Sequence, residues 1–455
     1  SCTIFVKYIH MSNPDIRNSI WIFCIAFLIR IGYVVLFVEI EYLVIEDQSL
    51  YIQLAQEFLV SGFLGVTPER TPGYPLFLSI ISNTSNDSLW NVVIIQIILD
   101  SVSCVIIALM AKSLFESGFW FAGFLSAFNL NMIVLSASIL TDTLFLFFFV
   151  LFLFSLIKYL HSENTKWLFL LFLFISLSAL VRAVSYYLIP VLLIGLVVWR
   201  VWKKDSILKV SKLVVLCLVI VGIFLGGIHQ RNYQKYGATE FVSQPGGAML
   251  WWIIPATYQY SGQGSYQEGQ ILAKKRLRLA LQHDNLISLS HNPFEASRYE
   301  VDVGKKILMD FGFLNVFKAW ASGSVVNILS PSVAFSPALR SMAHNSFYET
   351  EGVGVFSKLL NYIKNSENLF YLLVLLIGTI TSVLFTLLSL VGVFKSFNTL
   401  PPVTTLALLT LVGYFLVVTG PIIGVKYRLP IEPIMTLFFS YSLINFRKYK
   451  ISLIK

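Results

Sequence analysis

Long apolar runs recur along this chain of 455 residues, and short polar connections separate most of them. An apolar run of about 20 residues crosses a bilayer as a helix, so the pattern predicts an all-α polytopic membrane protein with about 10–12 transmembrane helices. Segment 312–330 is more polar, and it could either cross the membrane or lie along its surface. The expected spans are 18–38, 89–111, 118–138, 142–160, 167–182, 184–201, 211–229, 369–395, 402–421 and 429–446.

Two connections are long enough to hold structure of their own. Residues 47–60, 268–283 and 293–311 alternate apolar and polar positions at helical spacing, which predicts amphipathic helices along the membrane surface. The chain therefore divides into an N-terminal transmembrane module at 1–229 that includes the outer loop 39–88, a large loop region at 230–368, and C-terminal transmembrane helices at 369–455.

Composition and charge fit a membrane protein. The chain is 56% hydrophobic and 13% charged, whereas soluble domains are about 25% charged. Its net charge of +9 is concentrated in the loop at 200–212 and in the C-terminal tail, while loop 39–88 is acidic apart from Arg70. Because Lys and Arg gather in cytoplasmic loops, we expect loops 39–88 and 230–368 on the extracytoplasmic side, and no nucleic-acid partner.

The first outer loop carries a candidate catalytic carboxylate. Asp47, Tyr51 and Ala55 repeat every four residues and so share one face of the expected helix, with Glu46 next to Asp47. A carboxylate within hydrogen-bond distance of a hydroxyl or amine can take its proton as that group attacks. The alternative is that Asp47 only caps the helix.

Arg70 opens a turn rich in Pro and Gly, Arg70-Thr71-Pro72-Gly73-Tyr74-Pro75. It is the only cation in this acidic loop, and arginine makes bidentate contacts to phosphate oxygens. A salt bridge to Glu69 is the alternative interpretation.

Further charged residues stand at the expected outer ends of spans. Asp142 is costly at such depth unless it is functional or paired, although it could also cap its helix. Arg182 and Arg428 could each be a snorkelling cation, whose long side chain brings its charge to the membrane interface. Together with Arg231, at the depth of a lipid phosphate, they favour a site for an anionic lipid headgroup.

Several familiar sites are missing from the sequence. It has no phosphate-binding glycine loop, no dinucleotide fingerprint, and no HExxH or GxSxG motif. The histidines and the four cysteines have no spacing typical of a metal site or a disulfide framework. A nucleotide-sugar donor used in solution is therefore disfavoured.

The order of these motifs resembles the GT-C membrane glycosyltransferases that use polyprenyl-phosphate sugars, relatives of the protein O-mannosyltransferases and of the lipid A aminoarabinose transferases. The resemblance covers about residues 20–250 and the last span. It rests on Asp47-x3-Tyr51-x3-Ala55, the stretch from Arg70 to Leu76, Leu140-Thr141-Asp142, Arg182, Arg231-Asn232-Tyr233, and Tyr427-Arg428 with Pro430.

The resemblance implies an inverting transferase whose leaving group is the polyprenyl phosphate. Asp47 would be the general base or would orient the acceptor, with Glu46 beside it, and Asp142 would help to position a substrate. No cofactor is implied as required, although Glu46 and Asp47 leave a divalent metal open. The implied substrate contacts are Arg70, Tyr74, Arg182, Arg231, Tyr427 and Arg428.

The acceptor could be a lipid, a glycan or a protein, and we expect a bacterial inner membrane with the site facing outward. One rival is a ligase or polymerase of O-antigen type that moves a whole glycan. Another is a flippase of lipid-linked sugars, which would place charge at the membrane midplane. The charges singled out above lie at one face instead, which disfavours a flippase.

Overall fold

The computed structural model describes residues 13–39, 41, 43, 47–62, 67–82, 86–115, 117–342, 347 and 350–454, and most of these are helical. Within those residues no strand is present, so the predicted all-α class is confirmed. For residues 13, 86–88 and 445–454 only the backbone is described.

The bundle is formed by long apolar helices that correspond to the ten predicted spans. These are α2 (Asn13–Phe37), α5 (Asn86–Leu114), α6 (Gly118–Ala127), α7 (Leu130–Ser136), α8 (Thr141–Ser162), α9 (Thr165–Val181), α10 (Val184–Trp202), α11 (Ile207–Tyr236), α19 (Leu369–Ser396), α20 (Pro402–Thr419) and α21 (Glu432–Ile454).

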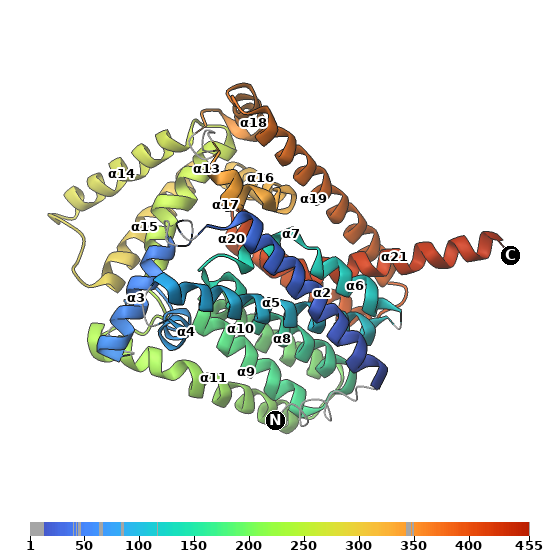
Figure 1. Cartoon of the computed structure of the whole chain (residues 1–455). Coiled ribbons are helices and arrows are strands. Elements are labelled where there is room, and N and C mark those ends of the chain that lie inside the picture. Colours follow the sequence, from blue (N-terminus) through green and yellow to red (C-terminus); the bar gives the residue numbers. More distant parts are fainter. Residues whose placement is uncertain are drawn as a thin grey trace.

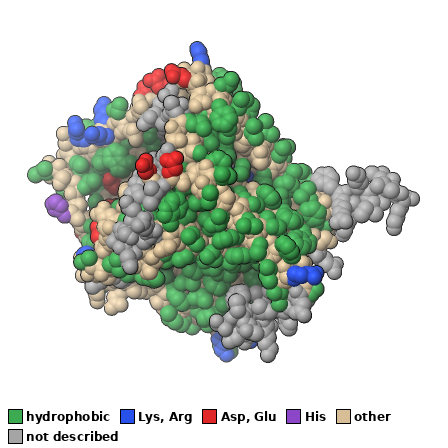
Figure 2. Space-filling model, in the orientation of Figure 1, with side chains coloured by type: hydrophobic (Ala, Val, Ile, Leu, Met, Phe, Trp, Pro, Cys, Tyr) green, Lys and Arg blue, Asp and Glu red, His purple; other side chains and the backbone are tan. Residues whose placement is uncertain are grey.

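Among the described residues, seven helices are long and apolar enough to cross a membrane, or eight if the bent pair α6 and α7 counts as one span. Helix α9, at 17 residues, is apolar but shorter. Figure 2 shows hydrophobic side chains as a broad field over the bundle, with charged groups mostly at its margins. Because such a surface cannot face water over this area, the chain is an integral membrane protein.

The remaining elements connect these helices, and most of them gather at one end of the bundle (Figure 1). They are α3 (Asp47–Ser61), α4 (Gly73–Ile81), α12 (Gln244–Ala248), η3 (Met249–Ile253), α13 (Ile254–Ser261), α14 (Tyr266–His283), α15 (Pro293–Phe311), α16 (Phe313–Leu329), η4 (Ser332–Phe335), α17 (Pro337–Arg340), α18 (Gly354–Lys364), η5 (Val425–Tyr427) and η6 (Leu429–Ile431).

Three of these elements confirm helices that the sequence predicts, since α3, α14 and α15 correspond to 47–60, 268–283 and 293–311. Ser265 begins α14 with a capping box, in which its side chain accepts from the Glu268 N–H while the Glu268 carboxylate accepts from the Ser265 N–H. The ambiguous segment 312–330 forms α16, which packs on α13, α19 and α20.

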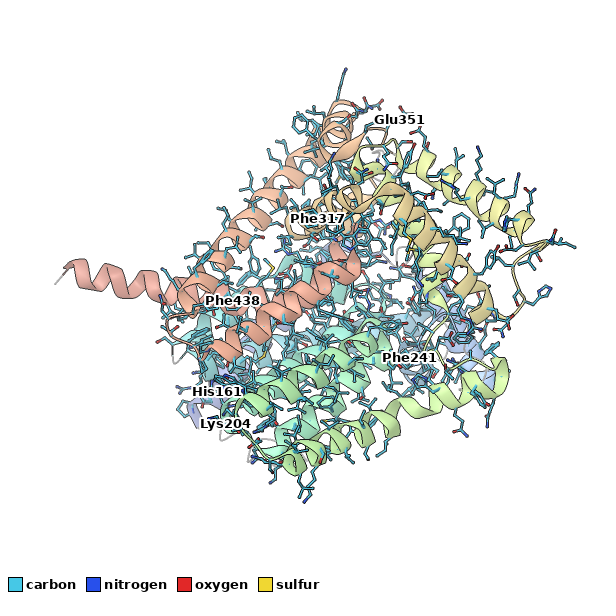
Figure 3. All side chains as sticks on the ribbon, turned by 180° about the vertical axis from the view of Figure 1, so that it is seen from behind. His161, Lys204, Phe241, Phe317, Glu351 and Phe438 are labelled. Carbon is cyan, nitrogen blue, oxygen red and sulfur yellow. The ribbon has the colours of Figure 1, made fainter. Side chains whose placement is uncertain are left out.

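Ion pairs mark the opposite end of the bundle. There Lys112 at the end of α5 pairs with Asp15 at the start of α2, and Glu163 after α8 pairs with Arg200 and Lys203. His161 and Lys204 lie close to this end in Figure 3. The loop at 200–212 is thus at one end, and Asp142 and Arg182 are at the other, as the loop charges predicted.

One ion pair lies inside the bundle, within two of the candidate spans, and the sequence reasoning missed it. Arg30 of α2 contacts Asp100 of α5 at 2.5 Å, and both side chains are buried. The Arg30 guanidinium also donates to the carbonyls of Ala26 and Ala127. The expectation that charge would lie at one face alone is therefore wrong, but this pair is closed off by protein and joins α2, α5 and α6.

We expect Asp100→Ala to lower the free energy of unfolding by about 3–5 kcal/mol, because it leaves the Arg30 charge buried without its counterion. The double variant Arg30→Met with Asp100→Leu should recover much of that loss, since no charge then stays buried. Thermal unfolding of the purified protein in detergent measures both.

The matched control is Arg276→Gln, which breaks an exposed ion pair to Asp310 and should change the unfolding temperature little. Equal losses in the Asp100→Ala single variant and in the double variant would contradict a role for charge pairing here.

Candidate active site

The site is built on the ends of α8 and α9. Asp142 stands in the first turn of α8, where the helix dipole favours an anion, and its side chain is only 3% exposed. Arg182 directly follows α9 as its C-terminal cap residue, and its Nη1 lies 2.5 Å from Asp142 Oδ1. Leu140 occupies the capping position of α8, so Asp142 is paired rather than a cap.

The Arg70 turn packs tightly against the residues that precede Arg182. The Thr71 hydroxyl donates to the Val181 carbonyl at 2.8 Å. Gly73 approaches the backbone so closely that a Cβ there would lie 2.6 Å from the Leu180 oxygen. Only glycine fits this contact, and it brings the first outer loop to the end of α9.

Tyr74, predicted to contact substrate, lies beneath the site and is fully buried. Its hydroxyl donates to Gln96 Oε1 at 2.8 Å, and the Gln96 amide donates to the Ser138 carbonyl at 2.7 Å. Since Ser138 precedes α8, these bonds tie the outer loop to the start of the helix that carries Asp142. In this arrangement Tyr74 positions the site instead of facing it.

Helix α3 places Tyr51 among the charged groups. Burial raises the pKa of the Tyr51 hydroxyl, against the opposing effect of Arg70 and Arg182, while Asp47 and Asp142 add to the rise. The Tyr51 ring also meets the Tyr74 ring edge-on, with centroids 5.2 Å apart. The structure therefore brings together four of the predicted residues around a tyrosine of the same motif.

Asp47 begins α3 at the open side of this group, with 49% of its side chain exposed. Its Oδ2 lies 3.4 Å from the Nζ of Lys426, which comes from the segment before the last helix. From the closed to the open side, the site thus runs from Asp142 through Arg182 to Lys426 and Asp47. A substrate would meet Asp47 first.

Lys426 and Tyr427 form the short helix η5, and neighbouring backbone groups hold this segment in place. Asn327 of α16 donates to the Ile422 carbonyl at 2.8 Å and accepts from the Gly424 N–H at 2.9 Å. Asn131 of α7 donates to the Val425 carbonyl at 3.1 Å. Hydrogen bonds from α16 and from α7 therefore fix the position of the segment that carries Lys426.

Two cations of the site remain protonated in spite of burial. Burial alone would lower the pKa of Lys426, but Tyr427, Asp142 and Asp47 raise it more, so that it lies above its usual value. Burial likewise lowers the pKa of Arg182, but Asp142, Tyr51 and Tyr427 raise it more, so that it also lies above its usual value. Below these raised pKa values both groups are positive, so a phosphate meets fixed charge at physiological pH.

Arg70 completes the cationic side of the site. Its Nε is buried and, among the described residues, has no hydrogen-bond partner. The alternative salt bridge to Glu69 is not among the ion pairs that the described residues form. A buried N–H without an acceptor is costly, and it points to a ligand oxygen.

The structure does not place Arg428 and Arg231 in this group. Arg428 is buried, contacts Glu432 at 2.7 Å and donates to the Ile328 carbonyl at 2.6 Å. Arg231 is buried in α11, where its guanidinium donates to Asn232 Oδ1. The Arg428 charge is paired with Glu432, whereas the partner Asn232 of Arg231 is neutral, so binding of the donor phosphate by either arginine stays a prediction.

Glu46 lies outside the described residues. Among the described residues, no group of three or more His, Cys, Asp or Glu side chains could hold a metal ion. The sequence reasoning missed Lys426 as a site residue. Its position next to Tyr427 and Arg428 was a usable signal, since all three belong to one outer turn.

Comparison with known proteins fits this geometry. A family model described as dolichyl-phosphate-mannose-protein mannosyltransferase matches residues 69–225, about a third of the chain. The match begins at the Arg70 turn and includes Asp142 and Arg182. No curated protein matches the sequence.

Among solved structures, the archaeal oligosaccharyltransferase AglB from Archaeoglobus fulgidus superimposes with a TM-score of 0.51 at 13% identity. The superposition covers 94% of this chain and 50% of that structure, so the chain spans about half the length of AglB. The chain has the GT-C fold. The predicted resemblance to GT-C enzymes is confirmed at the level of the fold.

Two further structures similar to this GT-C chain are those of ArnT from Cupriavidus metallidurans, one without ligand and one bound to undecaprenyl phosphate. Each is 14% identical and covers 93% of this chain and 76% of ArnT, with TM-scores of 0.39 and 0.38.

In this GT-C chain, Gly73→Ala should lower the free energy of unfolding by roughly 1–3 kcal/mol, because the new Cβ collides with the Leu180 carbonyl. Gly222→Ala is the matched control, since no atom lies within 4 Å of the added methyl group. It should be neutral or slightly stabilising, as alanine favours a helix. Thermal unfolding compares the two, and equal behaviour would contradict the tight contact.

Proposed function

We propose that this chain is an inverting glycosyltransferase that moves a sugar from a polyprenyl-phosphate donor to a lipid, glycan or protein acceptor. The observation that carries the proposal is the position of one accessible carboxylate, Asp47, which lies beside Lys426 and surrounds Tyr51 together with Arg70 and Arg182 at the end of a membrane bundle. The GT-C fold and the match to the mannosyltransferase family model support it.

The three cations are suited to a departing phosphate. Arg70 offers a buried N–H without an acceptor among the described residues, and Arg182 and Lys426 stay charged in a partly water-excluded site. Fixed charge aimed at a developing anion stabilises the transition state, and this electrostatic effect often contributes more to catalysis than any other. Asp142 keeps Arg182 in place through their ion pair and is a positioning residue.

Asp47 is suited to the acceptor side. An acceptor hydroxyl would pass its proton to the Asp47 carboxylate while its oxygen bonds to the sugar C1. The bond between C1 and the phosphate oxygen breaks at the same time, and the electron pair leaves with the polyprenyl phosphate. Attack opposite to the leaving group inverts the configuration at C1.

The proposal extends to location and cofactor. AglB was solved with dolichol-phosphate and an inhibitory peptide, which supports a sugar linked to a lipid phosphate as the donor here. We place the site on the extracytoplasmic face because the Lys and Arg cluster lies at the opposite end, and we propose a bacterial inner membrane as the location. No cofactor is part of the proposed reaction.

We expect Asp47→Asn to abolish transfer while donor binding and thermal stability persist, because the amide cannot take the proton and the cations are untouched. The assay offers radiolabelled polyprenyl-phosphate hexoses to the purified protein with membrane extract as acceptor. Glu57→Gln on the same helix is the matched control and should transfer normally, since Glu57 contacts Gln53 and not the site.

Full activity of Asp47→Asn would remove Asp47 from the reaction. If the donor binds but neither wild type nor variant consumes it, the chain would be a flippase of lipid-linked sugars instead.

Arg70→Gln should weaken donor binding about 10–100-fold, because a charge-assisted hydrogen bond to phosphate is lost. Arg231→Gln tests whether Arg231 lies outside the proposed phosphate site. Arg231 donates to Asn232, so its replacement should leave donor affinity nearly unchanged. Titration of a fluorescent polyprenyl phosphate gives both affinities. A larger loss for Arg231→Gln than for Arg70→Gln would move the phosphate site to α11.

A further inference from the structure

A separate cavity of about 310 Å³, with both apolar and charged side chains in its walls, opens at the same end of the bundle. It lies between the start of α10, the segment that follows α11, and helix α15, and Phe241 in Figure 3 marks the region beside it. This volume is within the range of small-molecule sites. The side chains that line it include Tyr187, Glu240, Arg298, Val301, Asp302 and Lys305.

The walls of this cavity are held rigidly. The Gly246 N–H donates to the Ser297 hydroxyl at 2.9 Å, and a Cβ on Gly246 would lie 2.6 Å from Ser297 Cα. At the start of α15, the Asn292 amide donates to the Tyr236 carbonyl at 2.8 Å. A cavity between such fixed elements is preorganised, so a ligand would lose little free energy in ordering it.

The charges along the cavity cancel. Arg298 contacts Glu240 at 2.6 Å, and Lys305 contacts Asp302 at 3.3 Å. Although burial would raise it, the pKa of Glu240 lies below its usual value because Arg298 donates to the carboxylate. The cavity is thus lined by two oppositely charged pairs with no excess of cations, which disfavours a phosphate ligand.

The same groups are well suited to a neutral molecule with many hydroxyls. Carboxylates accept from hydroxyls, while guanidinium and ammonium groups donate to them. Tyr187, a residue that is 42% exposed, adds an aromatic ring that can cover the apolar face of a sugar ring. This combination distinguishes the cavity from the cationic site around Arg70.

The cavity is also linked to the candidate active site through the backbone. The Ser243 N–H donates to the Pro68 carbonyl at 2.9 Å, and Ser243 lies between Val242 and Pro245, which both line the cavity. Pro68 is two residues before Arg70. A molecule in the cavity would thus lie beside the loop that carries one of the proposed phosphate contacts.

We propose that this cavity binds a neutral saccharide unit of the acceptor while another part of the acceptor reaches Asp47. This inference rests on the proposed function, since only a transferase needs an acceptor. It narrows the acceptor to one that already carries sugar, a glycan or a glycolipid.

The test measures binding without donor or turnover. Saturation-transfer NMR on the full-length protein would use a panel of neutral methyl glycosides as probes, in an amine-oxide detergent because maltoside detergents carry sugar themselves. At least one glycoside should bind to wild type and to Asp47→Asn alike. Inorganic phosphate should not displace it.

Two variants locate the binding. Tyr187→Ala removes the exposed ring and Val301→Trp fills the cavity, and each should weaken glycoside binding about tenfold. Met309→Trp is the matched control for Val301→Trp, because Met309 is on the same helix and 77% exposed. It should bind like wild type.

The outcomes separate this inference from the proposed function. The protein could bind a glycoside, lose affinity for it in Val301→Trp, and yet never transfer sugar. That result would support the saccharide site in the cavity and overturn the proposed transferase. No binding by any glycoside, equal binding to Val301→Trp and wild type, or displacement by phosphate would overturn the saccharide site while leaving the transferase intact.

Discussion

The ion pair between Asp142 and Arg182 is the constraint on which the site depends. It joins the start of α8 to the end of α9 where both helices meet the membrane surface. Removing one partner of a buried pair costs about 3–5 kcal/mol, because the other charge is left without compensation. The Arg70 turn then packs on the residues before Arg182, and Tyr51 lies against the same group. Rigid spans, rather than the loops themselves, thus determine where the functional groups stand.

The chain uses its buried and partly buried cations in two different ways. Arg30 and Arg428 are buried against Asp100 and Glu432, and each also donates to a backbone carbonyl. Such pairs hold helices together and leave no charge for a ligand. At the site, Arg182 pairs with Asp142, Lys426 lies beside the half-exposed Asp47, and Arg70 forms no ion pair among the described residues, so positive charge remains there for a phosphate. The two groups of cations differ in how far neighbouring carboxylates neutralise them, which depends on several residues together.

The large loop region reaches the site from two directions. The Ser243–Pro68 hydrogen bond joins it to the Arg70 loop. Tyr266 at the start of α14 lies close enough to Tyr427 for the two hydroxyls to interact electrostatically, which adds to the effect of burial in raising the pKa of Tyr266. The large loop region thus contacts both the Arg70 loop and the segment that contains Tyr427. It can therefore hold an acceptor beside a donor site that is built from other residues.

Local sequence was enough to define the all-helical class, the positions of the apolar helices, the surface helices α3, α14 and α15, and the motif residues Asp47, Arg70, Asp142 and Arg182. Hydropathy and helical period are local properties, so they can be read from the order of residues. Whether a charged side chain is paired within the protein or left for a ligand depends on the folded chain. Arg428 looked equivalent to Arg182, and Lys426 looked ordinary beside it, until the partners from distant helices were known. The burial of Tyr74 and the cavity at α15 likewise depend on contacts between segments far apart in the chain, which local patterns do not encode.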